Sequence, residues 1–500
     1  MWRWDAWPGR DGPDVGVDLV AEQRDGSLMA VQCKAYSETT SVTKASVDSF
    51  ITASPPAKFQ HRLLVASTDR IGVNARKVLS EHGVGVVVLD DLKRSIVTWP
   101  TAYEDLGDPA LAIAPRKPRP HQIEAVRSIC EGLSENDRGL VTMACGTGKT
   151  LTALWALEQL APDLSVVLVP SLNLLSQTLN EWTSASRLEW TFLCVCSDES
   201  VAKSDDVPRS QTIELGHPVT TDAEEIKRFV GRPGRKIIFG TYQSSDKLGT
   251  ALKASRTAAD IVFCDEAHRL VGRTDAAHSA ALTDDRFPAR KRLFLTATPR
   301  TYERSVRRSL ETRGLDVSDM NDDKIFGPRL YSLPFGAAIE RDLLTDYQVV
   351  IIGVPTSEIA SYAASRTLVS RADGATTDRS VLVAEVATVK AIKKFGLQRL
   401  ISFHARVSRA ESFAKYVGET AAQLSEGESN TVQKISALHV NGAMATSQRA
   451  ARLMALRDVP DGSSTIVTNA RCLTEGVDVP ELDGVVFADP KRSKVDVVQA

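Results

Sequence analysis

Residues 143–150, MACGTGKT, have the composition of a loop that binds phosphate. An apolar run precedes this stretch and a segment with apolar residues at helical spacing follows it, which is the strand, loop and helix context that a phosphate loop requires. Glycines let backbone N–H groups approach the phosphates, Lys149 would reach the β- and γ-phosphates of ATP, and Thr150 would ligate magnesium. The residues predicted to hold the nucleotide are Cys145, Gly146, Thr147, Gly148, Lys149 and Thr150.

A second stretch, VFCDEAHRL, places two carboxylates after an apolar run. Asp265 could hold magnesium through water, and Glu266 could orient and deprotonate the water that attacks the nucleotide. Taken alone, such a pair is often a solvated strand end. Together with the phosphate loop, it indicates ATP hydrolysis.

The third stretch lies near the start of the chain, at residues 17–36, VDLVAEQRDGSLMAVQCKAY, and reads as two strands joined by a turn. Gln32 and Lys34 are two residues apart on one strand, so both point to the same face. If Asp18 joins them, Asp18 and the Gln32 carbonyl could hold a magnesium ion, and Lys34 could neutralise charge that develops at a scissile phosphate.

The register of this hairpin decides whether the three side chains meet. A two-residue turn at Asp25 and Gly26 would set Asp18 opposite Cys33, on the wrong face. A three-residue turn ending at Ser27, or a bulge, would set Asp18 opposite Lys34, and this is the predicted arrangement. The alternative, an alternating hairpin with solvated polar residues, remains open on these residues alone.

Short β-branched runs alternate with helix-length segments over most of the chain, including SVVLVPS, DIVFCDEAH, RLFLTATP and STIVTNA. Continuous apolar strands of this kind belong to parallel sheets covered by helices, and polar residues at their carboxyl ends mark the ligand edge. We predict an α/β protein with an N-terminal domain over 1–99, a proline-rich linker over 100–117, and two parallel-sheet lobes over 118–335 and 345–500.

Composition limits the class of protein. The 500 residues are 43% hydrophobic and carry a formal net charge of -2, so no chain-wide basic field attracts nucleic acid, and DNA contacts must come from local clefts. The seven cysteines include no CxxC pair, which argues against a four-cysteine zinc site and favours a reducing cytoplasm. No stretch approaches the ~20 apolar residues that span a bilayer, so no membrane partner is expected.

From residue 119 to residue 500 the motifs resemble the superfamily 2 helicases and translocases of the DEAH-box type, in the order that this family has. The resemblance implies two RecA-like lobes. It also implies roles for the first lobe's motifs, RPHQIEAV, VPSLNLLSQTL, GTYQSS and LTATP. Gln122 would read adenine, Ser171 and Thr241 would contact the nucleic-acid strand, and His268, Thr296 and Thr298 would couple ATP hydrolysis to movement.

The second-lobe motifs of the same family resemble ISFHARVSRA and TNARCLTEGVDVP. The resemblance places Thr468 and Thr474 at the nucleic acid, and Gly476 and Asp478 at the ATP interface. The family's last motif, Gln-x-x-Gly-Arg-x-x-Arg, is matched by Gln499 alone. We therefore expect the second lobe to be incomplete here, with its arginines encoded further on, and we expect a longer chain to have higher DNA-stimulated ATPase.

The opening stretch resembles the PD-(D/E)xK nuclease fold in its Mrr-like form, in which Gln-x-Lys commonly replaces Glu-x-Lys. An Mrr-like nuclease, a linker and a translocase in this order are most similar to the single-chain type ISP restriction enzymes. That family adds a methyltransferase and a target-recognition domain downstream, and its members move along double-stranded DNA with ATP.

The resemblance predicts an ATP hydrolase and an endodeoxyribonuclease that need ATP and Mg²⁺ and act in the restriction of foreign DNA. The alternative is an enzyme that unwinds DNA or RNA, with the N-terminal domain serving as a non-cleaving binding or assembly module. A third possibility is a chain that only grips DNA or assembles with a partner that supplies the missing arginines.

Overall fold

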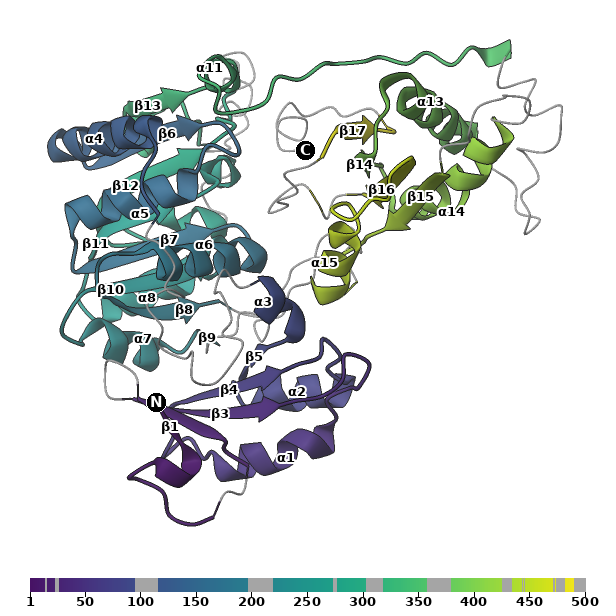
Figure 1. Cartoon of the computed structure of the whole chain (residues 1–500). Helices are drawn as coiled ribbons and strands as arrows, with labels where there is room; N and C mark the ends of the chain where they lie inside the picture. The colour runs from purple at the N-terminus through teal and green to yellow at the C-terminus, as the bar shows by residue number, and fades with distance from the viewer. Residues whose placement is uncertain are drawn as a thin grey trace. The chain divides into compact units, whose positions relative to one another are not determined.

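A computed structural model describes residues 1–13, 16–22, 27–94, 116–196, 219–272, 277–302, 318–357, 379–424, 434–442, 444, 446–470, 473 and 482–489. Three sheets follow one another along the chain: a five-stranded sheet, an eight-stranded sheet and a four-stranded sheet (Figure 1). One compact unit runs to Thr345 and contains the first two sheets, and the next begins at Asp346. Each part is described below by itself.

The N-terminal domain has a mixed sheet in the order β1-β2-β3-β4-β5, with β1, β2 and β3 antiparallel and β3, β4 and β5 parallel. The helices α1 and α2 contribute Val47, Phe50, Ala75 and Leu79 to its apolar core. The elements are β1 Trp2–Arg3, η1 Trp4–Ala6, β2 Leu19–Glu22, β3 Leu28–Lys34, α1 Lys44–Ala53, β4 His61–Ala66, α2 Val73–Glu81, β5 Gly85–Val87 and α3 Leu89–Arg94.

The first residues of the chain are held on this sheet by aromatic packing. Trp4 and Trp7 are buried with ring centroids 5.6 Å apart, and Trp7 packs on Phe59 at 5.5 Å. The Lys58 ammonium lies 4.8 Å from the Trp7 ring centroid, within the range of a cation–π interaction. The Trp4 N–H donates to the Asp18 carbonyl over 3.0 Å, so this packing fixes the backbone at Asp18.

The first lobe has a sheet of parallel strands in the order β13-β6-β12-β11-β7-β10-β8-β9. Its central strands are largely apolar because helices cover both faces, and β7 is buried at every position. One face packs on α4, α5 and α6, where Trp182 contacts Phe239 and Phe263 edge-on. The other face packs on α7, α8, α10 and the 3₁₀ helices η5, η6 and η7.

The bounds of the first-lobe elements follow in chain order. They are α4 Pro120–Glu135, β6 Arg138–Met143, α5 Lys149–Leu160, β7 Leu164–Val169, α6 Leu172–Ala185, β8 Thr191–Val195, β9 Val219–Thr220, α7 Ala223–Val230, β10 Lys236–Thr241, η5 Tyr242–Ser244, α8 Ser245–Ala254, β11 Ala259–Cys264, η6 Ala267–Leu270, η7 Ala277–Leu282, β12 Ala289–Thr296, α10 Asp323–Phe326, β13 Arg329–Leu333 and α11 Phe335–Glu340.

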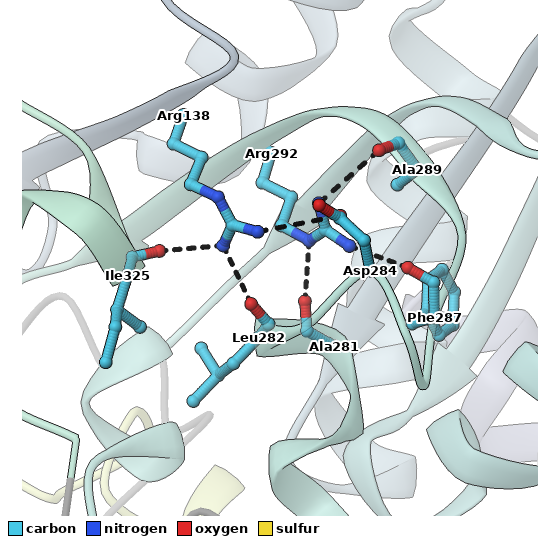
Figure 2. A network of polar contacts seen from close by, with 8 residues as sticks. All are labelled: Arg138, Ala281, Leu282, Asp284, Phe287, Ala289, Arg292 and Ile325. Carbon is cyan, nitrogen blue, oxygen red and sulfur yellow. Dashed lines mark hydrogen bonds and ion pairs between the residues drawn. The ribbon is translucent and has the colours of Figure 1, made fainter.

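Two arginines lie side by side near the amino ends of β6 and β12 (Figure 2). Arg292 is 2% exposed and donates to the carbonyls of Ala281 at 2.7 Å and Phe287 at 2.6 Å. Arg138 donates to the carbonyls of Leu282 at 2.8 Å and Ile325 at 2.9 Å. Burial and the neighbouring charge of Arg292 lower the pKa of Arg138. The pair therefore ties η7, the following loop and α10 to the sheet.

We expect Arg292→Met to lower the free energy of unfolding of the first lobe by about 3 kcal/mol, because two buried carbonyls lose their donor and each unsatisfied group costs about 1–3 kcal/mol. Urea unfolding followed by circular dichroism measures the loss. The matched control on the same strand is Arg290→Met, whose side chain is 76% exposed and 3.5 Å from Asp260. A surface pair of this kind is worth less than about 1 kcal/mol. Equal effects of the two substitutions would contradict the tethering role of Arg292.

The second lobe has a parallel sheet in the order β15-β16-β14-β17. The helices α13 and α14 pack on one face through Val389, Ile392, Phe413 and Val417, while Leu453 and Leu456 cover the other. The elements are α13 Arg379–Phe395, β14 Arg399–Phe403, α14 Val407–Gln423, β15 Lys434–His439, α15 Thr446–Met454, β16 Ser463–Asn469 and β17 Gly484–Phe487.

The predicted fold class is confirmed: a small α/β domain precedes two lobes built on parallel sheets. The residue limits proposed for the domains stay predictions. In the part of the chain that the structure describes, no helix combines the length and apolar character needed to cross a membrane.

Candidate ATP and nuclease sites

The phosphate loop connects β6 to α5, as its sequence context predicts. Gly146 and Gly148 have φ angles of 79° and 81°, a conformation that side chains other than glycine rarely adopt. A Cβ atom on Gly148 would also lie 2.3 Å from Gln122 Nε2. Both glycines are therefore required by the backbone conformation of the loop.

The helix α4 is attached to the back of this loop. The Gln122 amide N–H₂ donates to the Gly148 carbonyl over 3.3 Å, and its oxygen accepts from the Arg119 N–H over 2.8 Å. The neighbouring His121 Nε2 lies 2.9 Å from the Thr147 carbonyl. Gln122 thus joins the start of α4 to the loop, and its predicted contact with adenine stays a prediction.

Lys149 and Glu266 come together at the carboxyl ends of β6 and β11. Lys149 Nζ lies 3.7 Å from Glu266 Oε1, and both side chains are largely buried. Burial favours a lower pKa for the Lys149 ammonium, but the neighbouring groups Glu266, Cys145 and Asp265 together outweigh it and the pKa is raised. The sequence prediction that these two motifs form one site is consistent with this geometry.

The pKa values of Asp265 and Glu266 are shifted in opposite directions although the two residues are neighbours. Burial, followed by the charge of Glu266, raises the pKa of Asp265 to about 7. Burial also acts to raise the pKa of Glu266, but the hydrogen bond from His268 and the charge of Lys149 hold it below its usual value. Glu266 is the stronger acid of the pair and is ionised, as a base that accepts a proton from water must be.

A line of polar contacts leads from Glu266 away from the phosphate loop. His268 Nδ1 lies 3.3 Å from Glu266 Oε2 and 3.1 Å from Thr296 Oγ1. The Thr296 hydroxyl, which is fully buried, also accepts from the Thr298 N–H over 3.1 Å. The three residues predicted to couple hydrolysis to movement therefore form one connected chain that begins at the base.

We expect Thr296→Val to slow movement along DNA by about tenfold while ATP hydrolysis falls by less than about threefold. The valine keeps the shape but removes the only group that joins His268 to Thr298 in this line, and coupling energies of about 0.5–2 kcal/mol are typical of such networks. Comparing triplex displacement with ATP turnover measures the effect. Thr388→Val, which removes a buried hydroxyl bonded within α13, is the matched control. A parallel fall of both rates would contradict the coupling role.

The residues predicted to contact nucleic acid fall into three groups. Ser171 lies just after β7, and Thr241 is the last residue of β10. Because β7 and β10 are neighbours in the sheet, both residues lie at the ligand edge. Thr468 is fully buried, and its hydroxyl donates to the Ala410 carbonyl over 2.9 Å and meets His439 Nδ1 at 3.1 Å. This hydroxyl is engaged within the lobe, and the predicted contact of Thr468 with nucleic acid stays a prediction. Thr474 lies outside the described residues, as do Gly476 and Asp478, which were predicted at the ATP interface.

Two aromatic donors at this site were missed in the sequence. Trp182 Nε1 donates to the Thr150 carbonyl over 3.0 Å, and the Tyr242 hydroxyl donates to the Asp265 carbonyl over 2.5 Å. Tyr242 directly follows Thr241 in GTYQSS, and that position at the carboxyl end of a parallel strand was an available signal. Trp182 lies well inside a helix, and only the three-dimensional packing shows its contact.

The opening hairpin has a different register from the predicted one. Leu19 pairs with Val31 and Glu22 pairs with Leu28, so the ladder is shifted by two residues and Asp18 does not lie opposite Lys34. The last paired residues that the structure describes are Glu22 and Leu28. A shift of two residues keeps every side chain on its predicted face, because the period of a strand is two.

Asp18 nevertheless reaches the strand that carries Gln32 and Lys34. Asp18 Oδ2 accepts a hydrogen bond from the Cys33 N–H over 2.6 Å, between the two residues with which it was predicted to act. Burial, followed by the charge of Asp18, raises the pKa of the Cys33 thiol. In the described part of the chain the Lys34 ammonium has no ion-pair partner, and its side chain is half-buried.

The donor atoms at this place fit a magnesium ion. Gln32 is 3% exposed; its N–H₂ donates to the Gly16 carbonyl over 3.0 Å, whereas its buried oxygen accepts no hydrogen bond. With the Asp18 carboxylate this gives two oxygen ligands of the kind that Mg²⁺ prefers. No group of three His, Cys, Asp or Glu residues placed to hold a metal occurs among the described residues. A magnesium ion held here would therefore depend on an amide ligand.

Three family models match successive parts of the chain. Residues 1–107 match a family described as restriction endonuclease, residues 116–301 match type III restriction enzyme, res subunit, and residues 389–500 match helicase conserved C-terminal domain. The matches fall on the three sheets in order. The nuclease and helicase resemblances seen in the sequence are thereby confirmed.

Two solved structures are similar to this chain. The structure of the ATP-dependent type ISP restriction-modification enzyme LlaBIII bound to DNA is 30% identical, with a TM-score of 0.83 over 100% of this chain and 34% of that chain. A nuclease-deletion mutant of the type ISP enzyme LlaGI with a DNA substrate mimic is 28% identical, with a TM-score of 0.52 over 77% of this chain and 26% of that one.

Curated relatives include the probable helicase A859L of African swine fever virus. The protein of isolate Pig/Kenya/KEN-50/1950 is 24% identical over 385 residues, which cover 76% of this chain and 38% of that protein. The chain thus spans about a third of LlaBIII and 38% of the viral helicase.

Proposed function

Because the chain joins a restriction endonuclease domain to the two domains of a helicase, we propose that it is a double-stranded DNA translocase that carries its own nuclease and acts in the restriction of foreign DNA. The observation that carries the proposal is the line of contacts from Glu266 through His268 and Thr296 to Thr298. A site that only binds nucleotide does not need these contacts. In a motor, by contrast, hydrolysis at the catalytic base must change the conformation of other segments.

ATP, with magnesium, supplies the free energy of hydrolysis when it is bound. Lys149 would hold the β- and γ-phosphates, Thr150 and Asp265 would hold the metal, and Glu266 would take the proton of the attacking water. Ser171 and Thr241 would contact the DNA backbone, which positions a protein without reading sequence. The remaining contacts of the ATP interface, Gly476 and Asp478 among them, would come from the second lobe.

In the nuclease, Asp18 and Gln32 would hold Mg²⁺, which supplies positive charge at the scissile phosphate when it is bound. Lys34 would offset the negative charge that develops during cleavage. Since the six described cysteines are free, a reducing compartment such as the cytoplasm suits the protein. Methyltransferase and target-recognition domains, where encoded downstream, would supply the recognition site.

The test compares ATP turnover on linear duplex DNA and on single-stranded DNA, followed by triplex displacement and by cleavage of circular DNA with Mg²⁺. Duplex-specific stimulation, displacement of the third strand and ATP-dependent cutting are expected. Preferential stimulation by single strands, together with strand separation, would instead identify an unwinding helicase whose first domain binds without cutting. Binding of ATP without turnover in the presence of DNA would leave only a DNA-gripping or assembly role.

A further inference from the structure

Tyr242 makes a contact that none of the helicase roles assigned above includes. It opens the 3₁₀ helix that follows β10, and its side chain is 2% exposed. Its hydroxyl donates to the Asp265 carbonyl over 2.5 Å. Since β7 lies between β10 and β11 in the sheet, the phenol spans the end of β7 to reach the carboxylate pair.

The carbonyl that Tyr242 holds belongs to the peptide bond between Asp265 and Glu266. That peptide is held on its other side as well, because the Glu266 N–H donates to Asp265 Oδ1 over 2.9 Å. Glu266 has a φ angle of 50°, a strained value for a residue with a side chain. The orientation of the Glu266 carboxylate toward Lys149 and His268 therefore depends on this peptide keeping its rotation.

The segment that carries Tyr242 is a single hydrogen-bonded turn. The Thr241 hydroxyl lies 3.3 Å from Ser244 Oγ, and the Ser245 hydroxyl donates to the Tyr242 carbonyl over 2.7 Å. Thr241 ends β10 and Ser245 begins α8. A displacement of Thr241 is therefore carried directly into the backbone of Tyr242, rather than absorbed by a loose loop.

We infer that Tyr242 is a positioning residue that conveys the contact of DNA with the end of β10 to the Asp265–Glu266 peptide. This inference rests on the proposed motor function. DNA that contacts Thr241 moves the Tyr242 ring, the hydroxyl moves the Asp265 carbonyl, and the rotation of that peptide sets the direction of the Glu266 carboxylate. The contact provides a short route for stimulation of ATP hydrolysis by DNA, separate from the line through His268.

Tyr242→Phe tests the inference because it removes one oxygen atom and keeps the ring in its apolar surroundings. At saturating duplex DNA we expect kcat for ATP to fall about tenfold, which corresponds to about 1.4 kcal/mol. We expect KM for ATP, the affinity for a fluorescent nucleotide analogue and the thermal unfolding midpoint to stay within about twofold or a few degrees of the parent, since the phosphate loop is untouched.

Tyr331→Phe is the matched control, because it removes a hydroxyl from β13 at the edge of the same sheet. A raised KM with unchanged kcat, or equal effects of Tyr242→Phe and Tyr331→Phe, would overturn the inference. The same holds if Tyr242→Phe leaves the ratio of DNA-stimulated to unstimulated turnover at the parent value. Failure of the parent protein, at its full encoded length, to show any stimulation by DNA would instead count against the proposed function.

Discussion

Replacing Lys149 by alanine is expected to lower DNA-stimulated ATP hydrolysis by about 10²–10³-fold, the range found when one preorganised donor is removed from a transition state. Lys149 is the cation at the phosphate loop, it lies 3.7 Å from Glu266, and its side chain is 9% exposed. The substitution removes the charge that the phosphates would meet and leaves the Glu266 carboxylate without that partner. Steady-state ATP turnover with duplex DNA measures the effect.

The control for this prediction is Lys253→Ala, which removes a lysine from the last turn of α8 in the same lobe. We expect its turnover to remain within about twofold of the parent, as surface substitutions change little. Circular dichroism should show both variants folded. Unchanged hydrolysis in Lys149→Ala would contradict the assignment of the phosphate loop.

The second large effect is expected from Lys34→Ala in the nuclease. Cleavage of DNA should fall by about 10²–10³-fold, because no other described cation lies on the strand beside Asp18 and Gln32 to offset charge at the phosphate. ATP turnover should stay at the parent value, since the helicase motifs lie in other domains. Cutting of circular DNA with Mg²⁺, run in parallel with the ATP assay, measures both activities on one preparation.

Lys44→Ala provides the matched control in the same domain. Lys44 is exposed on α1 and pairs with Asp48 over 2.8 Å, a contact of small energetic value. Persistent cutting by Lys34→Ala would move the nuclease site elsewhere. Loss of cutting in Lys44→Ala to the same degree would show that the assay reports folding of the domain and not chemistry at Lys34.

The ATP site was largely predictable because its parts are local. A phosphate loop needs glycine at left-handed positions and lysine at the start of a helix, so Gly148 and Lys149 are visible in any sequence that has them. Asp265 and Glu266 follow a run of buried apolar residues, and parallel strands bring their carboxyl ends to one edge. For these residues, chain order and sheet geometry are enough to predict proximity.

Other features depend on packing between segments far apart in the sequence, and they escaped prediction. In the hairpin, Glu22 pairs with Leu28, and the residue types of the turn did not predict this register. The Thr468 hydroxyl donates to the Ala410 carbonyl on α14, a contact that its motif did not predict. The Tyr242 contact joins β10 to the end of β11 across β7, and no periodicity reports a hydrogen bond of that kind.

The aromatic packing around Trp4, Trp7 and Trp182 has a spectroscopic consequence. All seven tryptophans of the chain occur at or before residue 190, so the second lobe has none. Indole fluorescence therefore reports conformational changes in the nuclease and the first lobe, and it does not report changes in the second lobe. Phe487 on β17 stacks on Phe403 and is 38% exposed, so a tryptophan introduced there would give the second lobe an emission signal of its own.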